Sequence, residues 1–325
     1  MMHCKKNFSL LLAGACTASI FGFSFLFTKE ALDVLEPFHL LSFRFAVATL
    51  VFVIMQLCGL IKINLKGKNL RHLALLTLME PVLYFICETI GVNITTSSEA
   101  AIIISLLPVF IVIFAAFYLK EKPTPVQTGF ILLSVSGVIF MTVMKESFKV
   151  GANMLGTFIL LGAVISAGIY NVLSRKLSSE FTPVEITYTM VWVGAVVFNG
   201  ISVAQHLIKG KLSYYFYPLT NGKALVSIIY LGVCSSVAAY FMLNYLLSKI
   251  ESSRVSVISN VATIISVIAG AVFRNEPIYW FNVVGAIMIL SGVWGTNRYG
   301  KIDAFTRRQK VNHTSKTMMK SEVES

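Results

Sequence analysis

The sequence contains few charged residues. Asp, Glu, Lys and Arg together make up 13% of the 325 residues, whereas hydrophobic residues make up 56%. A soluble globule of this size needs more polar surface than that to cover its exterior. The mean hydropathy of +0.77 points the same way. The shortage of charge therefore argues against a soluble globular protein and favours a chain embedded in a lipid bilayer.

Cysteine pairs and the motifs of common enzymes are also missing. The five cysteines show neither paired nor metal-type spacing, so we interpret them as small core residues. The sequence has no HExxH pair, no Gly-rich phosphate loop, and no Ser or Cys nucleophile beside a base at membrane depth. We therefore expect no metal, no cofactor and no enzymatic activity. An integral-membrane enzyme and a membrane signalling or assembly protein remain the alternatives.

Long apolar runs are what the sequence does have. A transmembrane helix needs about 20 mostly apolar residues to cross the hydrocarbon layer. The runs predict an all-α integral membrane protein with ten transmembrane helices at residues 8–28, 38–60, 71–92, 97–119, 125–144, 154–174, 183–205, 223–247, 253–273 and 278–297. Residues 298–325 are polar, and we predict that they form a disordered cytoplasmic tail.

The basic residues are distributed unevenly across the predicted membrane. With the N-terminus in the cytoplasm, nineteen of the 27 Lys and Arg residues fall inside and seven outside. This is the positive-inside pattern, which predicts that both termini are cytoplasmic in a multi-pass protein of the cell membrane. We expect the net charge of +12 to face anionic lipid rather than nucleic acid. The expected partners are the bilayer and a small-molecule substrate, with a monomer as one acceptable assembly.

The two halves of the sequence resemble each other. An offset of 155 residues aligns Glu121 with Glu276, and the Ser-Ser pair at 97–98 with the pair at 252–253. We therefore divide the chain into two five-helix repeats, residues 1–150 and 151–297. Because five is an odd number, the second repeat would be inverted relative to the first, as in carriers that work by alternating access.

Two matching runs carry a family resemblance. The first is TSSEAAIIISLLPVFIVIFAAFYLKEKPTPVQTGFILLSVSGVIF, and the second is ESSRVSVISNVATIISVIAGAVFRNEPIYWFNVVGAIMILSGVW. They closely resemble the EamA-type carriers of the drug/metabolite transporter superfamily. The resemblance implies a transporter but not its substrate, because this family handles amino acids, metabolites, nucleotide sugars and drugs. One departure is Thr263, which stands where the first copy has Pro108.

Two charges lie at nearly one depth in the first half. Arg44 lies about 9 Å below the outer face and Glu88 about 6 Å below it, on helices joined by a short loop. An unpaired Arg inside a membrane helix costs at least about 2.5 kcal/mol, so a partner is expected. We predict an Arg44–Glu88 ion pair, and a substrate-binding role for Glu88 is the equal alternative.

Glu80 has no cation at its own depth in the first half. It precedes Pro81, whose ring disturbs the helix and leaves backbone groups short of partners. A carboxyl group at such a place is suited to bind a cation, an amine or a proton. Burial favours its neutral form, so it could take up a proton on one side and release it on the other. The alternative is a neutral Glu80 hydrogen-bonded to helix backbone.

The second half has no acid at the matching position, where Tyr240 and Asn244 stand instead. Tyr188 and Trp192, one turn apart, either line a pocket or anchor their helix at the interface. Glu185, assigned to the outer end of that helix, is expected to be a solvated rim residue. The complete set of substrate-binding or coupling candidates is Glu80, Tyr84, Glu88, Tyr170, Asn171, Tyr188, Trp192, Tyr240 and Asn244.

These residues suggest a working mechanism. We expect export of a small organic metabolite, such as an amino acid, an amine or an amphipathic solute, in exchange for protons.

Overall fold

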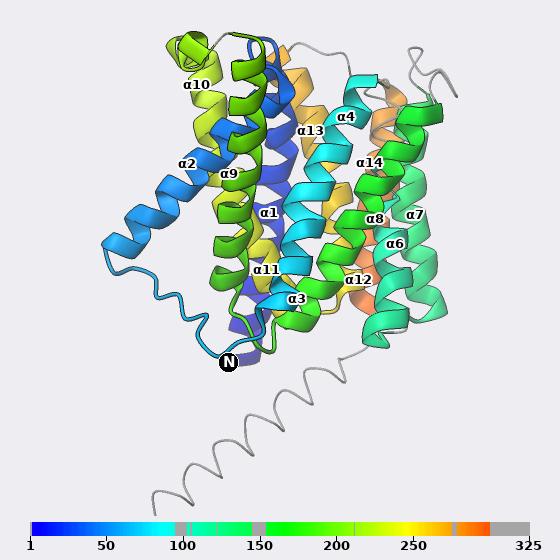
Figure 1. Ribbon diagram of the computed structural model, residues 1–325. Coiled ribbons are helices and arrows are strands. Elements are labelled where there is room, and N and C mark those ends of the chain that lie inside the picture. The colour runs from blue at the N-terminus through cyan, green and yellow to red at the C-terminus, as the bar shows by residue number, and fades with distance from the viewer. Residues whose placement is uncertain are drawn as a thin grey trace, which may run out of the picture.

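The computed structural model describes residues 2–94, 103–104, 106–121, 123–144, 154–210, 212–274 and 278–299. Every regular element in these ranges is a helix, and the helices stand side by side in one bundle (Figure 1). We call the end with the N-terminus of α1 (Met2–Leu32) and the start of α3 (Leu70–Thr77) the lower end. The opposite end, with the start of α10 (Gly222–Ile229), is the upper end.

The remaining elements follow in chain order. In the first half they are α2 (Pro37–Leu57), η1 (Leu78–Leu83), α4 (Tyr84–Ile94), α6 (Leu107–Phe114), η2 (Ala115–Leu119) and α7 (Pro125–Val143). In the second half they are α8 (Met154–Leu177), α9 (Pro183–Ile208), η3 (Leu212–Tyr214), η4 (Tyr217–Thr220), η5 (Tyr230–Ala239), α11 (Tyr240–Lys249), α12 (Ser252–Ser256), α13 (Ile258–Arg274) and α14 (Trp280–Tyr299).

Seven of these helical stretches are long and apolar enough to cross a membrane. They are Phe8–Leu32, Pro37–Leu57, Leu70–Gly91, Met154–Leu177, Pro183–Ile208, Gly222–Lys249 and Ser252–Phe273. The predicted segments 97–119, 125–144 and 278–297 contain shorter apolar helices within the described residues: Leu107–Tyr118, Pro125–Met141 and Trp280–Thr296. The all-α class and the multi-pass character are thus confirmed.

Local sequence sets where the two central helices begin. Pro37 and Pro183 occupy the first turns of α2 and α9, where a missing N–H costs nothing and the ring favours helical φ. Thr182 and Glu185 form a capping box: the Thr182 hydroxyl accepts from the Glu185 N–H at 3.3 Å, and the Glu185 carboxylate accepts from the Thr182 N–H at 2.8 Å.

Two long helices are interrupted inside the bundle. The helix of α3, η1 and α4 is kinked at Glu80, whose φ of −146° and ψ of 120° are extended. Pro81 explains the kink, because it has no N–H for the carbonyl one turn earlier and its ring clashes there. In the second half, η5 winds more widely than an α-helix through the small residues of GVCSSVAA.

Helix pairs from different halves make up much of the packing. Extensive contacts join α7 with α14, α1 with α13, α2 with both α9 and η5, and α8 with both α4 and α6. Glycine lets several backbones approach closely. A Cβ on Gly285 would lie 2.8 Å from the carbonyl oxygen of Gly137, so larger residues at this crossing would push α7 and α14 apart.

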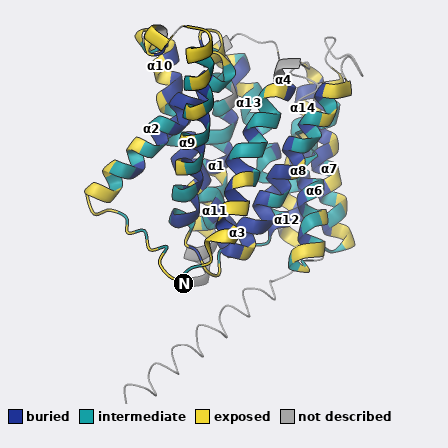
Figure 2. Cartoon of the chain, in the orientation of Figure 1, coloured by how far each residue is buried: buried dark blue, intermediate teal, exposed yellow. Residues whose placement is uncertain are grey.

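Side-chain burial fits a bundle in lipid. Buried residues lie between the helices, and exposed residues lie on the outer faces and at the ends (Figure 2). Many of the exposed side chains are large and apolar, including Phe117 at 83% and Val196 at 69% exposure. Ser97, Ser98, Glu276 and residues 300–325, on which some predictions rest, lie outside the described residues.

Candidate functional site

Glu80 lies at the kink of the first interrupted helix and is buried, with 5% exposure. The hydroxyl of Tyr240, the first residue of α11, donates a hydrogen bond to Glu80 Oε1. The predicted carboxylate of the first half therefore meets a predicted residue of the second half. The alternative in which Glu80 bonds to helix backbone is not what the structure shows, because its partner is a side chain from another helix.

Aromatic rings surround the Tyr240 side chain. Phe21 of α1 packs edge-on against it with ring centroids 5.4 Å apart, and Tyr170 of α8 does so at 6.3 Å. Both tyrosines are buried, at 4% and 0% exposure. These rings exclude water from the Glu80–Tyr240 hydrogen bond, which strengthens the bond and raises the cost of leaving either partner without one.

Asn244 connects three helices one turn beyond Tyr240. Its Oδ1 accepts from Tyr170 Oη at 3.0 Å and from Ser174 Oγ at 2.6 Å, both on α8. Its Nδ2 donates to Thr187 Oγ1 of α9 at 3.1 Å. Asn244 is fully buried and uses both oxygen lone pairs, so its role in this structure is to hold α8, α9 and α11 together.

Asn171, the neighbouring candidate, behaves differently. Its Nδ2 donates to the carbonyl of Ala167 in its own helix at 2.8 Å. The structure thus brings Glu80, Tyr240, Tyr170 and Asn244 into one connected cluster, and Asn171 is not hydrogen-bonded to them. We call these four residues the central cluster.

Arg44 has partners other than the predicted one. Its Nε donates to Ser236 Oγ at 2.7 Å and one terminal nitrogen donates to Ser235 Oγ at 3.0 Å. The guanidinium also lies 4.8 Å from the ring centroid of Phe85. Among the described residues no ion pair joins Arg44 to Glu88. The predicted Arg44–Glu88 ion pair is therefore replaced by hydrogen bonds to η5.

Close packing of η5 against α2 explains this difference. A Cβ on Gly232 would lie 2.7 Å from the Cβ of Val47 and 3.0 Å from the carbonyl oxygen of Arg44. The absent side chain lets η5 lie directly beside Arg44, which brings Ser235 and Ser236 within reach. Sequence reasoning missed these two serines, as it missed Ser174 and Thr187, and Gly232, three residues before Ser235, was the available signal.

Glu88 and Tyr84 lie beside the central cluster, one helical turn apart on α4, and their side chains interact. Arg44 is close enough to Glu88 and Glu80 for Coulombic attraction, although it forms a direct ion pair with neither of them. Glu88 is only partly buried. Glu88 is therefore more accessible to a ligand than Glu80.

Tyr188 and Trp192 lie one turn apart on α9, and Tyr188 directly follows Thr187. Their rings lie 6.1 Å apart, and Tyr188 packs edge-on against Phe52 of α2 at 5.6 Å. Within the described residues no hydrogen bond connects either of them to Glu80 or Asn244. The structure therefore does not place these two candidates in the central cluster.

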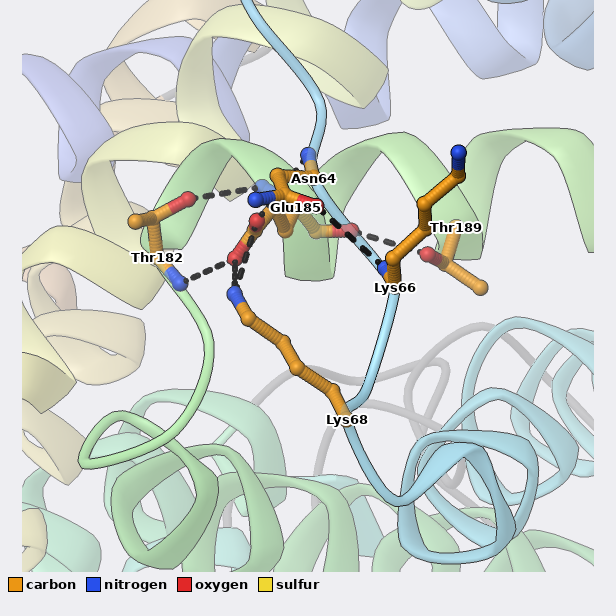
Figure 3. Close-up of polar contacts among 6 residues, drawn as sticks. All are labelled: Asn64, Lys66, Lys68, Thr182, Glu185 and Thr189. Carbon is orange, nitrogen blue, oxygen red and sulfur yellow. Dashed lines mark hydrogen bonds and ion pairs between the residues drawn. The ribbon is translucent and has the colours of Figure 1, made fainter.

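Glu185 corrects a further expectation. It is 3% exposed, and its carboxylate binds Lys68 Nζ at 2.6 and 2.8 Å and the Asn64 N–H at 3.3 Å (Figure 3). It lies at the lower end, together with Lys68, and not at the opposite rim. Successive helices alternate in direction, so α9 starts on the side where α8 ends. Counting helices from the N-terminus would therefore have placed Glu185 at the lower end.

A buried ion pair joins several segments at the lower end. Arg175 is fully buried near the end of α8. Its Nε donates to Glu121 Oε1 at 3.1 Å, and its Nη1 donates to the carbonyl of Leu247 at 2.8 Å. Glu121 Oε2 accepts from the N–H of Ser252 at 3.1 Å. From the sequence, Arg175 was predicted only to be a basic residue at a helix end. Composition does not predict that its side chain is buried.

The described residues contain no group of three or more His, Cys, Asp or Glu side chains arranged to hold a metal ion. The side chains of the central cluster are carboxyl, phenol and amide groups, which transfer protons and form hydrogen bonds.

Comparison with known proteins gives consistent matches. Residues 8–143 and 154–298 both match the EamA-like transporter family. An uncharacterized transporter of Bacillus subtilis (strain 168), YcxC, is 39% identical over 286 residues, which cover 88% of this chain and 92% of that protein. An uncharacterized transporter of Archaeoglobus fulgidus is 26% identical over 281 residues, covering 86% and 95%.

More distant matches extend this picture. A probable amino-acid metabolite efflux pump of Escherichia coli (strain K12) is 22% identical over 198 residues, which cover 60% of this chain and 65% of the pump. One crystal structure matches with a TM-score of 0.74 and 17% identity, covering 89% of this chain and 98% of the other. At that identity the structural match concerns the fold alone.

Proposed function

Because the chain belongs to the EamA-like transporter family, we propose that it exports a small organic metabolite across the cytoplasmic membrane by alternating access coupled to protons. The observation that carries this proposal is the buried hydrogen bond between Glu80 and Tyr240. It places an ionisable group between helices of the two halves, where a relative movement of the halves would change its surroundings.

The architecture that we propose is two inverted five-helix repeats, residues 1–150 and 151–297, with both termini in the cytoplasm. The helix pairings support it. If the two halves are exchanged, the pairing of α1 with α13 maps onto that of α8 with α6, and the pairings of α2 with α9 and α7 with α14 map onto themselves. Two separate matches to one family in a single chain also favour duplication.

In this proposal the lower end is cytoplasmic and is closed in the present conformation. The Arg175–Glu121 pair and its bonds to Leu247 and Ser252 connect α8, α11 and α12 there. Opening toward the cytoplasm would require these bonds to break. Because a buried charge left without its partner is costly, the pair favours the closed arrangement.

Glu80 would be the coupling residue. Exposure to one side of the membrane would let its carboxyl group lose or gain a proton, and return to the buried site would favour the neutral form. Tyr240 donates a hydrogen bond to Glu80 in this conformation. A change in the protonation of Glu80 would therefore alter a contact between the two repeats. Proton transfer and helix movement would then be linked through one hydrogen bond.

For the substrate we propose an amino acid or another small amine. A relative carries the name of a probable amino-acid metabolite efflux pump, and Arg44 and Glu88 offer both signs of charge near the central cluster. Glu88 is the residue that we would assign to the ammonium group, because it is partly accessible and has no direct ion-pair partner among the described residues.

Uptake of labelled amino acids into proteoliposomes under an imposed pH gradient tests the proposal. We expect the gradient to accelerate uptake by the wild-type protein but not by Glu80→Gln, in which the amide can still accept the Tyr240 hydrogen bond. Glu36→Gln, at an exposed pair with Lys209, is the matched control. Conversion of a substrate without net flux would overturn the transporter assignment.

A further inference from the structure

A second site is formed where α2 and α9 separate toward the lower end. Figure 1 shows α2 leaning away from α9, and the segment 58–69 crossing back to α3. A cavity of about 550 Å³ lies in this gap. Its walls are Gln56 at the end of α2, Tyr188 of α9, and residues of the crossing segment, namely Ile63, Leu65, Lys66, Gly67, Lys68 and Leu70.

The crossing segment is fixed in place. Glu185 holds it through Lys68 and through the N–H of Asn64, as Figure 3 shows. Lys68 also lies 5.2 Å from the ring centroid of Phe181. The ion pair between Lys68 and the buried Glu185 carboxylate therefore holds this wall of the cavity in place. The same pair neutralises the charge of Lys68.

Lys66, in contrast, has no ion-pair partner among the described residues. Its side chain is exposed and extends away from Glu185 in Figure 3. Only its backbone N–H is engaged, by Asn64 Oδ1 at 3.3 Å. The rim of the cavity thus carries one unmatched positive charge, together with the amide of Gln56.

An apolar groove continues upward on the same face of α9. Tyr188, Trp192 and Val196 are spaced four residues apart, which places them in one row along the helix. Trp192, Val193, Val196 and Val197 line a second cavity of about 240 Å³. Trp192 and Val196 are 38% and 69% exposed. A basic, partly polar cavity is therefore followed by a purely apolar one along a single helix.

We propose that an anionic phospholipid binds in this gap, with its phosphate at Lys66 and Gln56 and one acyl chain along Trp192 and Val196. The site combines features that an amphiphile requires: a cation at the membrane interface and an apolar groove at hydrocarbon depth. Acyl chains surround the exposed apolar faces of a membrane protein, so this groove is filled by lipid in a bilayer. Lys66 then selects among headgroups by charge.

This site is separate from the central cluster. Neither Glu80 nor Tyr240 lines either cavity. The lipid site therefore does not depend on the proposed transport function, and it assigns Tyr188 and Trp192 to lipid contact.

Native mass spectrometry of the purified full-length protein tests the headgroup contact, after incubation with phosphatidylglycerol or phosphatidylcholine. We expect the wild type to retain phosphatidylglycerol preferentially, and Lys66→Gln to lower that retention about tenfold, since a charge-assisted contact is lost. Lys62→Gln is the matched control, because it removes the same charge from the same exposed segment but does not line the cavity. Equal losses in the two variants, or equal retention of the two lipids, would overturn the proposal.

A second pair of variants tests the groove. Val196→Trp should fill the space for the acyl chain and lower retention, whereas Ile287→Trp, on the exposed face of α14, should not. Glycerol phosphate, which has the headgroup charge without acyl chains, should bind far more weakly than phosphatidylglycerol. Equal binding of glycerol phosphate would identify a soluble-anion pocket and would overturn the lipid assignment. An unchanged melting temperature of each variant in detergent verifies that the variants are folded.

Discussion

In the proposed repeats, the helix of α3, η1 and α4 corresponds to the helix of α10, η5 and α11, yet the chemistry of the two helices differs. Both are interrupted inside the bundle. The first carries two carboxylates, Glu80 and Glu88, whereas residues 222–249 contain no acid at all. The second supplies hydroxyl and amide groups instead, and one of these, Tyr240, donates to Glu80.

This difference shows how the bundle accommodates buried ionisable groups. Neutral donors and acceptors from one half satisfy the charged or ionisable groups of the other: Tyr240 meets Glu80, and the serines of η5 meet Arg44. A second acid at the Tyr240 position would add repulsion and another desolvation cost. Of these two interrupted helices, the one in the first half is therefore the one with acidic groups that can bind a proton or a cation.

The largest stability effect should come from the neutral half. Asn244→Leu removes three buried hydrogen bonds between helices, each worth roughly 0.6 to 1.7 kcal/mol in membrane proteins, so we expect a loss of about 2–4 kcal/mol. Asn171→Leu is the matched control, because its amide bonds only within its own helix, and it should cost less than about 1 kcal/mol. Unfolding in detergent measures both. Equal losses would contradict the role of Asn244 as a connection between helices.

The bond between the halves should show energetic coupling. Tyr240→Phe leaves the Glu80 carboxyl without its donor, and we expect it to cost about 1–3 kcal/mol. In a double-mutant cycle with Glu80→Leu, the two changes should be non-additive by about 1 kcal/mol or more. Additive losses in the unfolding free energy would show that the two residues do not depend on each other.

Two further double-mutant cycles compare the two possible partners of Arg44. Arg44→Leu combined with Ser236→Ala should show a coupling of about 1 kcal/mol, from a hydrogen bond of 2.7 Å to a charged donor. The coupling of Arg44→Leu with Glu88→Gln should be smaller, since no direct ion pair joins them among the described residues. The reverse order would restore the ion pair that the sequence alone had suggested.

The smallest effect is expected for a carboxylate at the exposed upper end. Glu36 bonds to Lys209 at 2.7 Å, and this hydrogen bond lowers the pKa of Glu36 below its ordinary value of 4.5. The pair stabilises the folded state above that value and ceases to do so as the pH falls through the lowered pKa. Because the pair is exposed, Glu36→Gln should change stability by less than about 0.5 kcal/mol at pH 7. A larger loss, or one that persists at acidic pH, would contradict this.

Hydrophobicity made much of the fold predictable. Apolar runs predicted the positions of the helices, and a carboxylate next to proline in such a run predicted Glu80 as a functional residue. The matching offset between the halves also marked Tyr240 and Asn244. These predictions needed only distances along the chain, which sequence provides directly.

The contacts around each helix were harder to predict. Depth along the membrane normal placed Arg44 and Glu88 at one level, but it gave no information on which neighbouring helix each side chain faces. The close approach of η5 at Gly232 decided that question in favour of Ser235 and Ser236. Burial of Arg175 and Glu185 likewise depends on how loops fold over the bundle end, which hydropathy does not describe.

Proton movement measured inside proteoliposomes is the most direct test of the central claim that Glu80 couples transport to protons. A pH-sensitive dye is enclosed with the purified protein, and gradients of individual amino acids are applied across the membrane. We predict that the wild-type protein and Glu36→Gln change the internal pH when a transported amino acid is present, and that Glu80→Gln does not. An unchanged proton flux in Glu80→Gln would contradict the account.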